Sequence, residues 1–203
     1  DITNVTKLPR VDILYAYLDM SPALIDASAG DGTNAAKGIV IAGVGTNATA
    51  HSVELARQAE KVGVDGVLLV TPYYNKPTPE GLFQHYSAIA SEVGLPVIVY
   101  NVPGRTGCNV DVATLVRLSG VPGIVGVKEA SGNITQMVEV CGAVPKDFLV
   151  LSGDDALTLP LMSLGGRGII SVAAKEVQAE MVQMVEAAER GDFAAARVIH
   201  NKL

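Results

Sequence analysis

The sequence predicts a single-domain α/β protein, built as a (β/α)-barrel with about seven parallel strands that is incomplete or rearranged relative to an eight-stranded barrel. Short β-branched runs recur with helix-like segments between them, and their starts lie roughly 20 to 30 residues apart, the spacing of β-α units. The runs are almost continuously apolar, which is typical of parallel strands covered on both faces. Polar side chains gather at the carboxyl ends of several runs, and these ends converge in a barrel but not in an open sheet.

Seven strands are expected, each a short apolar run that ends at a polar or small residue. They lie at residues 11–17, 38–44, 66–71, 96–101, 123–129, 148–153 and 168–173. Apolar residues at helical spacing predict helices at residues 52–62, 80–93, 179–190 and 193–200. Gly63 and Gly94 follow two of these helices and are expected C-caps, because glycine readily adopts the left-handed conformation.

The composition favours a compact cytoplasmic protein. Of 203 residues, 49% are hydrophobic and 18% charged, so the chain can bury a substantial core. The net charge of -6 argues against a nucleic-acid partner. No apolar stretch approaches the roughly 20 residues that span a bilayer, and no signal-peptide pattern is present, so no membrane partner is expected. The three histidines are scattered and the two cysteines share no motif, which gives no support to a metal site or a disulfide.

Lys128 ends an apolar strand-like run that begins at Gly123. Burial would disfavour its ammonium form, lower its pKa and leave a neutral amine at working pH. Such an amine attacks ketones and aldehydes to give a Schiff base. The alternative is a lysine whose stem lies along the strand end while its charge reaches solvent.

Two further residues suit the same chemistry. Tyr100 ends the preceding strand, and a phenol near the amine can donate and accept protons while an imine forms. Arg105 follows in a Pro-Gly-Arg-Thr-Gly turn and carries a planar charged group suited to carboxylates. On residue type alone, a strand-end aromatic with a satisfied hydroxyl is favoured for Tyr100, and a solvated loop charge is favoured for Arg105. Asp154 and Asp155 suggest a metal ligand pair, but adjacent residues of a strand face opposite ways, and a helix N-cap is favoured.

Five ordered motifs between about residues 39 and 203 resemble the dihydrodipicolinate synthase family, which are pyruvate-dependent lyases of the N-acetylneuraminate lyase superfamily. They lie at residues 42–49, 70–75, 100–107, 126–132 and 151–155. The resemblance implies that Lys128 forms an imine with pyruvate without any other cofactor, and that Tyr100 relays protons beside it. It implies that Arg105 binds the carboxylate of aspartate semialdehyde.

The same resemblance implies further site residues. Gly153 and Ile170 would contact the substrate, and Tyr74 would be the tyrosine that neighbouring subunits exchange. Asn47 and Tyr73 match positions of the family's lysine-inhibition site, but part of that site is missing, so no regulation by lysine is expected.

The front of the chain departs from the family pattern. The Gly-Thr-Thr-Gly-Glu type motif, whose threonines hold the pyruvate carboxylate and complete the proton relay, does not occur. Residues 7–17 and 36–45 instead resemble the flavodoxin-like C-terminal domain of bacterial type II L-asparaginases.

These departures predict an engineered chimera, with a β-α-β segment over residues 1–45 joined to the third strand through the eighth helix of a barrel over residues 39–203. Catalysis is expected to be weak or lost, and the alternative is a functional pyruvate-dependent lyase that uses Lys128. Seven strands leave two sheet edges that invite pairing with another chain, so a homo-oligomer is expected. A small keto acid is the only other partner expected.

Overall fold

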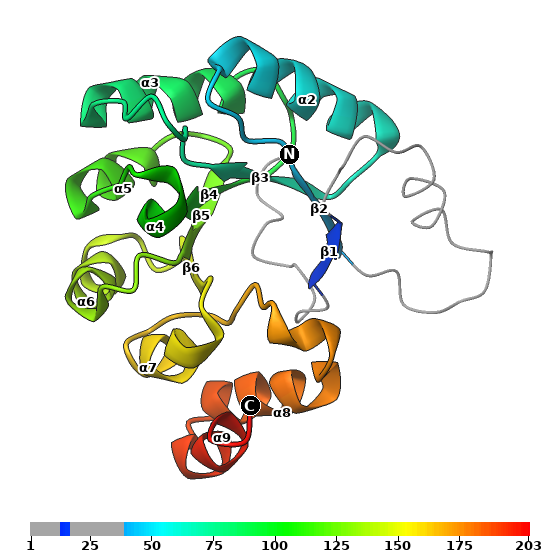
Figure 1. The fold of residues 1–203 in the computed structure, drawn as a ribbon, viewed down its shortest axis with the longest axis vertical. Helices are drawn as coiled ribbons and strands as arrows, with labels where there is room; N and C mark the ends of the chain where they lie inside the picture. Colours follow the sequence, from blue (N-terminus) through cyan, green and yellow to red (C-terminus); the bar gives the residue numbers. More distant parts are fainter. Residues whose placement is uncertain (1–12, 17–38) are drawn as a thin grey trace.

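The computed structural model describes residues 13–16 and 39–203, which form one curved sheet with helices on its outer side (Figure 1). Six strands follow one another in chain order and all pair in parallel. They are β1 (Ile13–Ala16), β2 (Ile39–Gly43), β3 (Gly66–Val70), β4 (Val97–Asn101), β5 (Ile124–Glu129) and β6 (Leu149–Ser152). A single parallel bridge between Ser152 and Ile169 continues the sheet beyond β6. This sequential parallel order is that of a barrel wall and confirms the predicted fold class.

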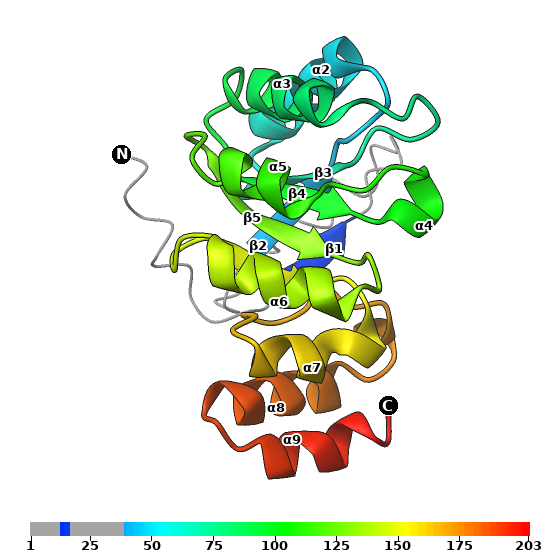
Figure 2. The ribbon, with the colours of Figure 1, turned by 90° about the vertical axis from the view of Figure 1, so that its left-hand side faces the viewer.

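The helices follow the strands and stack in chain order along the sheet (Figure 2). They are α2 (Thr49–Val62), α3 (Pro79–Ala90), α4 (Pro103–Thr106), α5 (Val112–Leu118), α6 (Ile134–Ala143), α7 (Thr158–Ser163), α8 (Gln178–Glu189) and α9 (Phe193–His200), with short 3₁₀ helices η2 (Asp155–Leu157) and η3 (Ala173–Lys175). Side-chain caps start several of them, because an oxygen there accepts a backbone N–H that the helix leaves unbonded. The capping residues of these α-helices are Thr78, Asp111, Asn133 and Asp192.

The two faces of the sheet are covered differently. Leu69, Val99 and Val127 are register partners on the helix side, and each is fully buried in the main hydrophobic core. Leu68 and Ile98 are register partners on the opposite face and belong to a smaller apolar cluster. Apolar burial on both faces explains why the strands read as continuous hydrophobic runs.

A β-bulge between β4 and β5 determines which way β5 presents its last residues. Val97 pairs with Ile124, but the next pair is Ile98 with Gly126, so one residue of β5 is extra. Without that residue, the alternation that starts at Ile124 would turn Lys128 toward the helices. With it, Lys128 becomes the register partner of Tyr100 and shares its face of the sheet.

The predicted strand at residues 168–173 is wrong in extent. Backbone bonds to β6 run only from Arg167 to Ile170. Beyond that point the Asp155 carboxylate accepts the backbone N–H groups of Val172 and Ala173, at 3.3 and 3.2 Å. These two N–H groups therefore cannot pair with a neighbouring strand, and the backbone continues into η3.

The two predicted glycine C-caps, Gly63 and Gly94, have different outcomes. Gly63 caps α2 with a φ of +81°, which confirms the predicted left-handed C-cap. The helix expected to reach Val93 instead ends at Ala90, and Ser91 is its C-cap. Gly94 is therefore no cap, and its N–H donates to Glu60 Oε1 at 2.7 Å.

The predicted N-terminal β-α-β segment is described only in its strands. β1 and β2 lie within the predicted ranges 11–17 and 38–44, and Ile13 pairs with Ile39 at the start of their register. The segment predicted between them lies outside the described residues. Within residues 13–16 and 39–203, no helix is long and apolar enough to cross a membrane.

Candidate active site

Lys128 and Tyr100 face each other at the carboxyl ends of β5 and β4. Lys128 is 5% exposed, and its Nζ lies 4.2 Å from the centroid of the Tyr100 ring. Tyr100 packs at the edge of the apolar cluster on that face of the sheet. A cation this close to an aromatic face is attracted to it, which helps to hold the amine beside the phenol.

Because Gly153 has no side chain, it leaves room for the carbon atoms of the Lys128 side chain. A methyl group at Gly153 would lie 2.8 Å from Lys128 Cε, 3.0 Å from Cγ and 2.8 Å from Ala130 Cβ. These distances are so short that the Lys128 side chain or Ala130 would have to shift to accept a larger residue at this position. The Gly153 N–H donates to the Glu129 carbonyl oxygen at 2.8 Å, which fixes this backbone against β5. The structure therefore brings Gly153 beside Lys128, and its contact with a substrate stays a prediction.

The surroundings of Lys128 prepare its amine for nucleophilic attack. The pKa of Lys128 is lowered to about 8: burial is the largest cause, the nearby Arg105 charge acts in the same direction, and the Asp155 carboxylate opposes both. Desolvation is thus the main cause, as expected for an ammonium group in an apolar strand. A substantial fraction of neutral amine exists near neutral pH, and this fraction grows as pH rises.

Arg105 lies on α4, the short helix that directly follows β4. The predicted turn is thus one helical turn, which starts at Pro103 and ends at Gly107 with a φ of +72°. The Arg105 side chain is exposed, yet its charge acts on Lys128. Two cationic groups that act on the same region suit an anionic substrate such as a keto acid.

The two aspartates after β6 have structural roles. Asp154 accepts the Ala156 N–H at 3.0 Å and caps η2, as predicted. Asp155 accepts the Ser171 hydroxyl and two backbone N–H groups, so it ties the end of β6 to the segment after Ile169. Among the described residues, no group of three or more His, Cys, Asp or Glu side chains could hold a metal ion.

Tyr74 and Ile170 differ sharply in exposure. The Tyr74 side chain is 88% exposed and its backbone adopts a φ of +71°. Ile170 is 1% exposed in the apolar cluster on the Lys128 face of the sheet. Contact of either residue with a substrate stays a prediction.

A buried polar network behind the site was missed by sequence reasoning. Asn101 and Glu129 pair in register, one residue beyond Tyr100 and Lys128, and both are 0% exposed. The Glu129 carboxylate accepts the Ser131 N–H at 2.6 Å and the Asn101 and Gln136 amides at 3.1 and 3.3 Å. Two polar side chains at the ends of apolar strands were the available signal. The network holds the ends of β4 and β5 together from the helix side.

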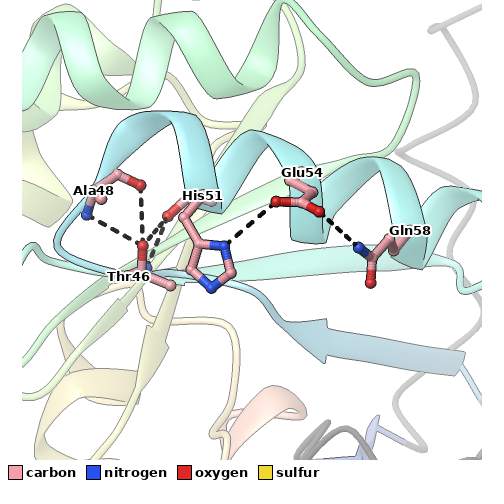
Figure 3. A network of polar contacts seen from close by, with 6 residues as sticks. Thr46, Ala48, His51, Glu54 and Gln58 are labelled. Atoms are coloured by element: carbon pink, nitrogen blue, oxygen red, sulfur yellow. Dashed lines mark hydrogen bonds and ion pairs between the residues drawn. The ribbon is translucent and has the colours of Figure 1, made fainter.

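The loops that follow β2 and β3 are joined beside the site. Asn75 donates its side-chain amide to the Asn47 carbonyl oxygen at 2.8 Å. Thr46 lies at the centre of a local network, in which its hydroxyl donates to the Ala48 carbonyl and its N–H donates to Ser52 (Figure 3). His51 and Glu54 continue this polar row along the exposed side of α2, where His51 Nδ1 lies 3.6 Å from Glu54 Oε2 (Figure 3).

The fold and the site define a (β/α)-barrel protein with a candidate lysine nucleophile, in which an amine with a lowered pKa lies beside a phenol at the carboxyl ends of the strands. Comparison with known families agrees with this class. Residues 31–203 match the dihydrodipicolinate synthetase family, and the chain belongs to that family. The match begins before residue 39, where the sequence motifs placed its start.

Curated relatives are similar over most of this chain. The 4-hydroxy-tetrahydrodipicolinate synthase of Moorella thermoacetica is 54% identical over 164 residues, which are 81% of this chain and 56% of that protein. The enzyme of the same name from Bacillus subtilis is 50% identical, over 81% of this chain and 57% of its own length. The chain thus spans little more than half the length of these relatives.

Solved structures give the same result. Dihydrodipicolinate synthase from Aquifex aeolicus superposes with a TM-score of 0.83 at 44% identity, covering 89% of this chain and 60% of that one. The Thermotoga maritima enzyme superposes with a TM-score of 0.81 at 41% identity, with the same coverage.

Proposed function

We propose that Lys128 forms an imine with pyruvate, the first step of the reaction for which the similar 4-hydroxy-tetrahydrodipicolinate synthases are named. The observation that carries this proposal is the Lys128 amine, with a pKa of about 8, held 4.2 Å from the centre of the Tyr100 ring. A buried lysine of purely structural use would be destabilised by its burial and by the flanking Arg105 charge.

The chemistry follows from these groups. The neutral Lys128 amine attacks the keto carbon of pyruvate, and the carbonyl oxygen takes up a proton as the C–N bond forms. Loss of that oxygen as water, with the second amine proton, leaves the imine. Tyr100 is the nearby group that can donate and recover protons during these transfers. Arg105 would then hold the carboxylate of the second substrate, aspartate semialdehyde.

We expect complete turnover to be slow. The Gly-Thr-Thr-Gly-Glu type motif is absent from the 203 residues. A missing member of a proton relay costs about 10²–10⁴-fold in rate. Imine formation needs fewer groups than the full condensation and should survive better.

Borohydride reduction in the presence of pyruvate tests the proposal. We expect a reduced pyruvyl adduct, found by intact mass and mapped to Lys128 by peptide analysis. Lys128→Arg should form none, while Lys146→Arg, which changes an exposed lysine, should react like the parent chain. A folded chain that gives no adduct, or an adduct elsewhere, would sink the proposal.

A second proposal concerns origin: residues 1–45 derive from an asparaginase-like β-α-β segment joined within residues 39–45 to the lyase barrel. It rests on the resemblance of residues 7–17 and 36–45 to the asparaginase C-terminal domain, and it must accommodate a family match that already begins at residue 31. Independent reads of the source DNA across codons 1–60 test it. One uninterrupted natural gene would contradict a joined origin.

A further inference from the structure

Thr71 lies where β3 ends and the loop that carries Tyr74 begins. It follows Val70, the last residue of β3, and Val70 is the register partner of Tyr100. The next residue is Pro72, which has no N–H to donate. The Thr71 N–H, which donates to the Tyr100 carbonyl oxygen at 3.0 Å, is therefore the last backbone bond that this stretch of β3 can give to β4.

The Thr71 side chain adds a second bond at the same point. Its hydroxyl donates to the Tyr100 carbonyl oxygen at 2.9 Å, and Thr71 is 0% exposed. The Tyr86 hydroxyl of α3 lies 3.2 Å from the same Thr71 oxygen, and Tyr86 is 0% exposed as well. A carbonyl oxygen only accepts, so the Thr71 hydroxyl uses its proton there and Tyr86 must donate to Thr71.

These contacts have a fixed direction, from helix to threonine to strand end. Burial raises the pKa of Tyr86 above its usual range, so its hydroxyl stays protonated and keeps donating. Tyr86 lies in the main hydrophobic core, where close packing leaves its ring little freedom. These two hydrogen bonds thus connect α3 to Tyr100, the residue that faces Lys128.

We propose that Tyr86 and Thr71 are positioning residues that hold Tyr100 against Lys128 through this hydroxyl relay. The proposal rests on the proposed function, since it concerns the alignment of Tyr100 for imine formation. Tyr100 is one residue from the end of β4, and a strand end frays more easily than its middle. Proton transfer demands a placement good to about 0.5 Å. Two donors on one carbonyl supply that restraint from the helix side, away from the substrate.

Time-resolved borohydride trapping with pyruvate tests the relay in the full chain. Loss of one relay member should slow imine formation at saturating pyruvate by about tenfold in Thr71→Val and about threefold in Tyr86→Phe. The half-saturating pyruvate concentration should stay within about twofold, because neither residue touches pyruvate. Thr71→Ser should restore the rate. Tyr86→Phe should have no further effect in a Thr71→Val background, because the relay is already broken there.

Thr114→Val is the matched control, a buried threonine of α5 that does not contact Tyr100. It should leave the trapping rate unchanged. An equal slowing in Thr114→Val would assign the effect to general packing and overturn the proposal. Additive effects of Thr71→Val and Tyr86→Phe would overturn it too, because residues of one relay cannot act independently.

Amide hydrogen exchange at Thr71 gives a readout that does not depend on chemistry. Tyr86→Phe should raise the exchange rate of this amide about fivefold, whereas Thr114→Val should not, because only the first loosens the Thr71–Tyr100 contact. Faster Thr71 exchange in Tyr86→Phe, together with no adduct in the parent chain, would uphold the relay and reject the proposed function. Adduct formation at one rate in all variants would uphold the function and reject the relay.

Discussion

At the scale of single residues, the buried Lys128 that we propose as the nucleophile also lowers the stability of the fold. Its pKa of about 8 in the fold lies below the usual 10.5, so the unfolded chain binds more protons between these values. Stability therefore rises as pH rises through that window, and the full penalty of the buried ammonium is present below pH 8.

Lys128→Met removes this penalty and should stabilise the protein. At pH 7 we expect the free energy of unfolding to rise by roughly 2–3 kcal/mol, from about 1.4 kcal/mol per pKa unit. The gain should fade as pH rises from 8 past 10.5, because the amine is neutral in both states only above that range. Urea titrations at pH 7 and pH 10 measure it, and Lys146→Met, at an exposed position, should show no such gain. A destabilised Lys128→Met chain at pH 7 would contradict this account.

Arg105 should shift the pH at which Lys128 reacts. Its charge lowers the pKa of Lys128, so Arg105→Met should raise that pKa and move the pH midpoint of pyruvate trapping upward. Arg167→Met removes an exposed arginine that does not act on Lys128 and should leave the midpoint in place. A midpoint that stays fixed, or moves downward, in Arg105→Met would refute the assignment.

Gly153→Ala should displace the Lys128 stem. The new methyl group would meet Lys128 Cε at 2.8 Å, and overpacking of this kind costs about 1–3 kcal/mol. We expect both lower stability and at least about tenfold slower trapping, since misplacement weakens catalysis steeply. Gly142→Ala, in α6 with open space around its Cβ, should stabilise the chain slightly and leave trapping unchanged. Normal trapping in Gly153→Ala would show that the stem can take another path.

At the scale of elements, the sequence predicted which segments form strands better than how they align. Lys128 was found because a charge at the end of an apolar run is unusual. The bulge that turns it toward Tyr100 was not foreseeable, since residues 123–127 are uniformly small or apolar and carry no mark of the extra residue. The seventh strand failed for a long-range reason, because Asp155 takes the N–H groups that a ladder would need.

The packing of α2 against α3 contains an acid-sensitive group. His85 is 6% exposed, and its Nδ1 lies 2.9 Å from the Thr49 hydroxyl. Within the described part of the chain its Nε2 has no hydrogen-bond partner. Burial lowers the pKa of His85 to about 4 from its usual 6.5. Protonation in the fold is thus disfavoured, and stability should fall as pH drops from 6.5 to 4.

Replacement of His85 should reduce this loss of stability at acid pH. We expect His85→Leu to lose less stability than the parent chain between pH 7 and pH 4, by about 2 kcal/mol. Urea midpoints across that range measure the difference. His51→Leu changes an exposed histidine of α2 and should keep the parental slope. Equal slopes for His85→Leu and the parent would remove His85 as the cause.

At the scale of the whole molecule, the described sheet is a barrel wall with two ends. β1 is its first strand, and a single bridge at Ile169 is its last pairing. The structure brings the lysine, the phenol and the glycine together because they come from adjacent strands, β4, β5 and β6. Because these strands are adjacent in the sheet, the sequence motifs at their carboxyl ends were sufficient to predict which residues meet.

Within residues 13–16 and 39–203 the sheet ends at β1 and at the Ile169 bridge, and these ends predict self-association. The terminal strand of a parallel sheet presents backbone N–H and C=O groups that can pair with another chain. The exposed Tyr74 ring offers a second contact surface beside the site. We expect sedimentation velocity at micromolar concentration to show dimers or larger species, and Tyr74→Ser to weaken them if subunits exchange this ring. A single sharp monomer boundary would contradict association. A dimer unaffected by Tyr74→Ser would assign it to the sheet ends instead, because edge pairing uses backbone groups that the substitution leaves in place.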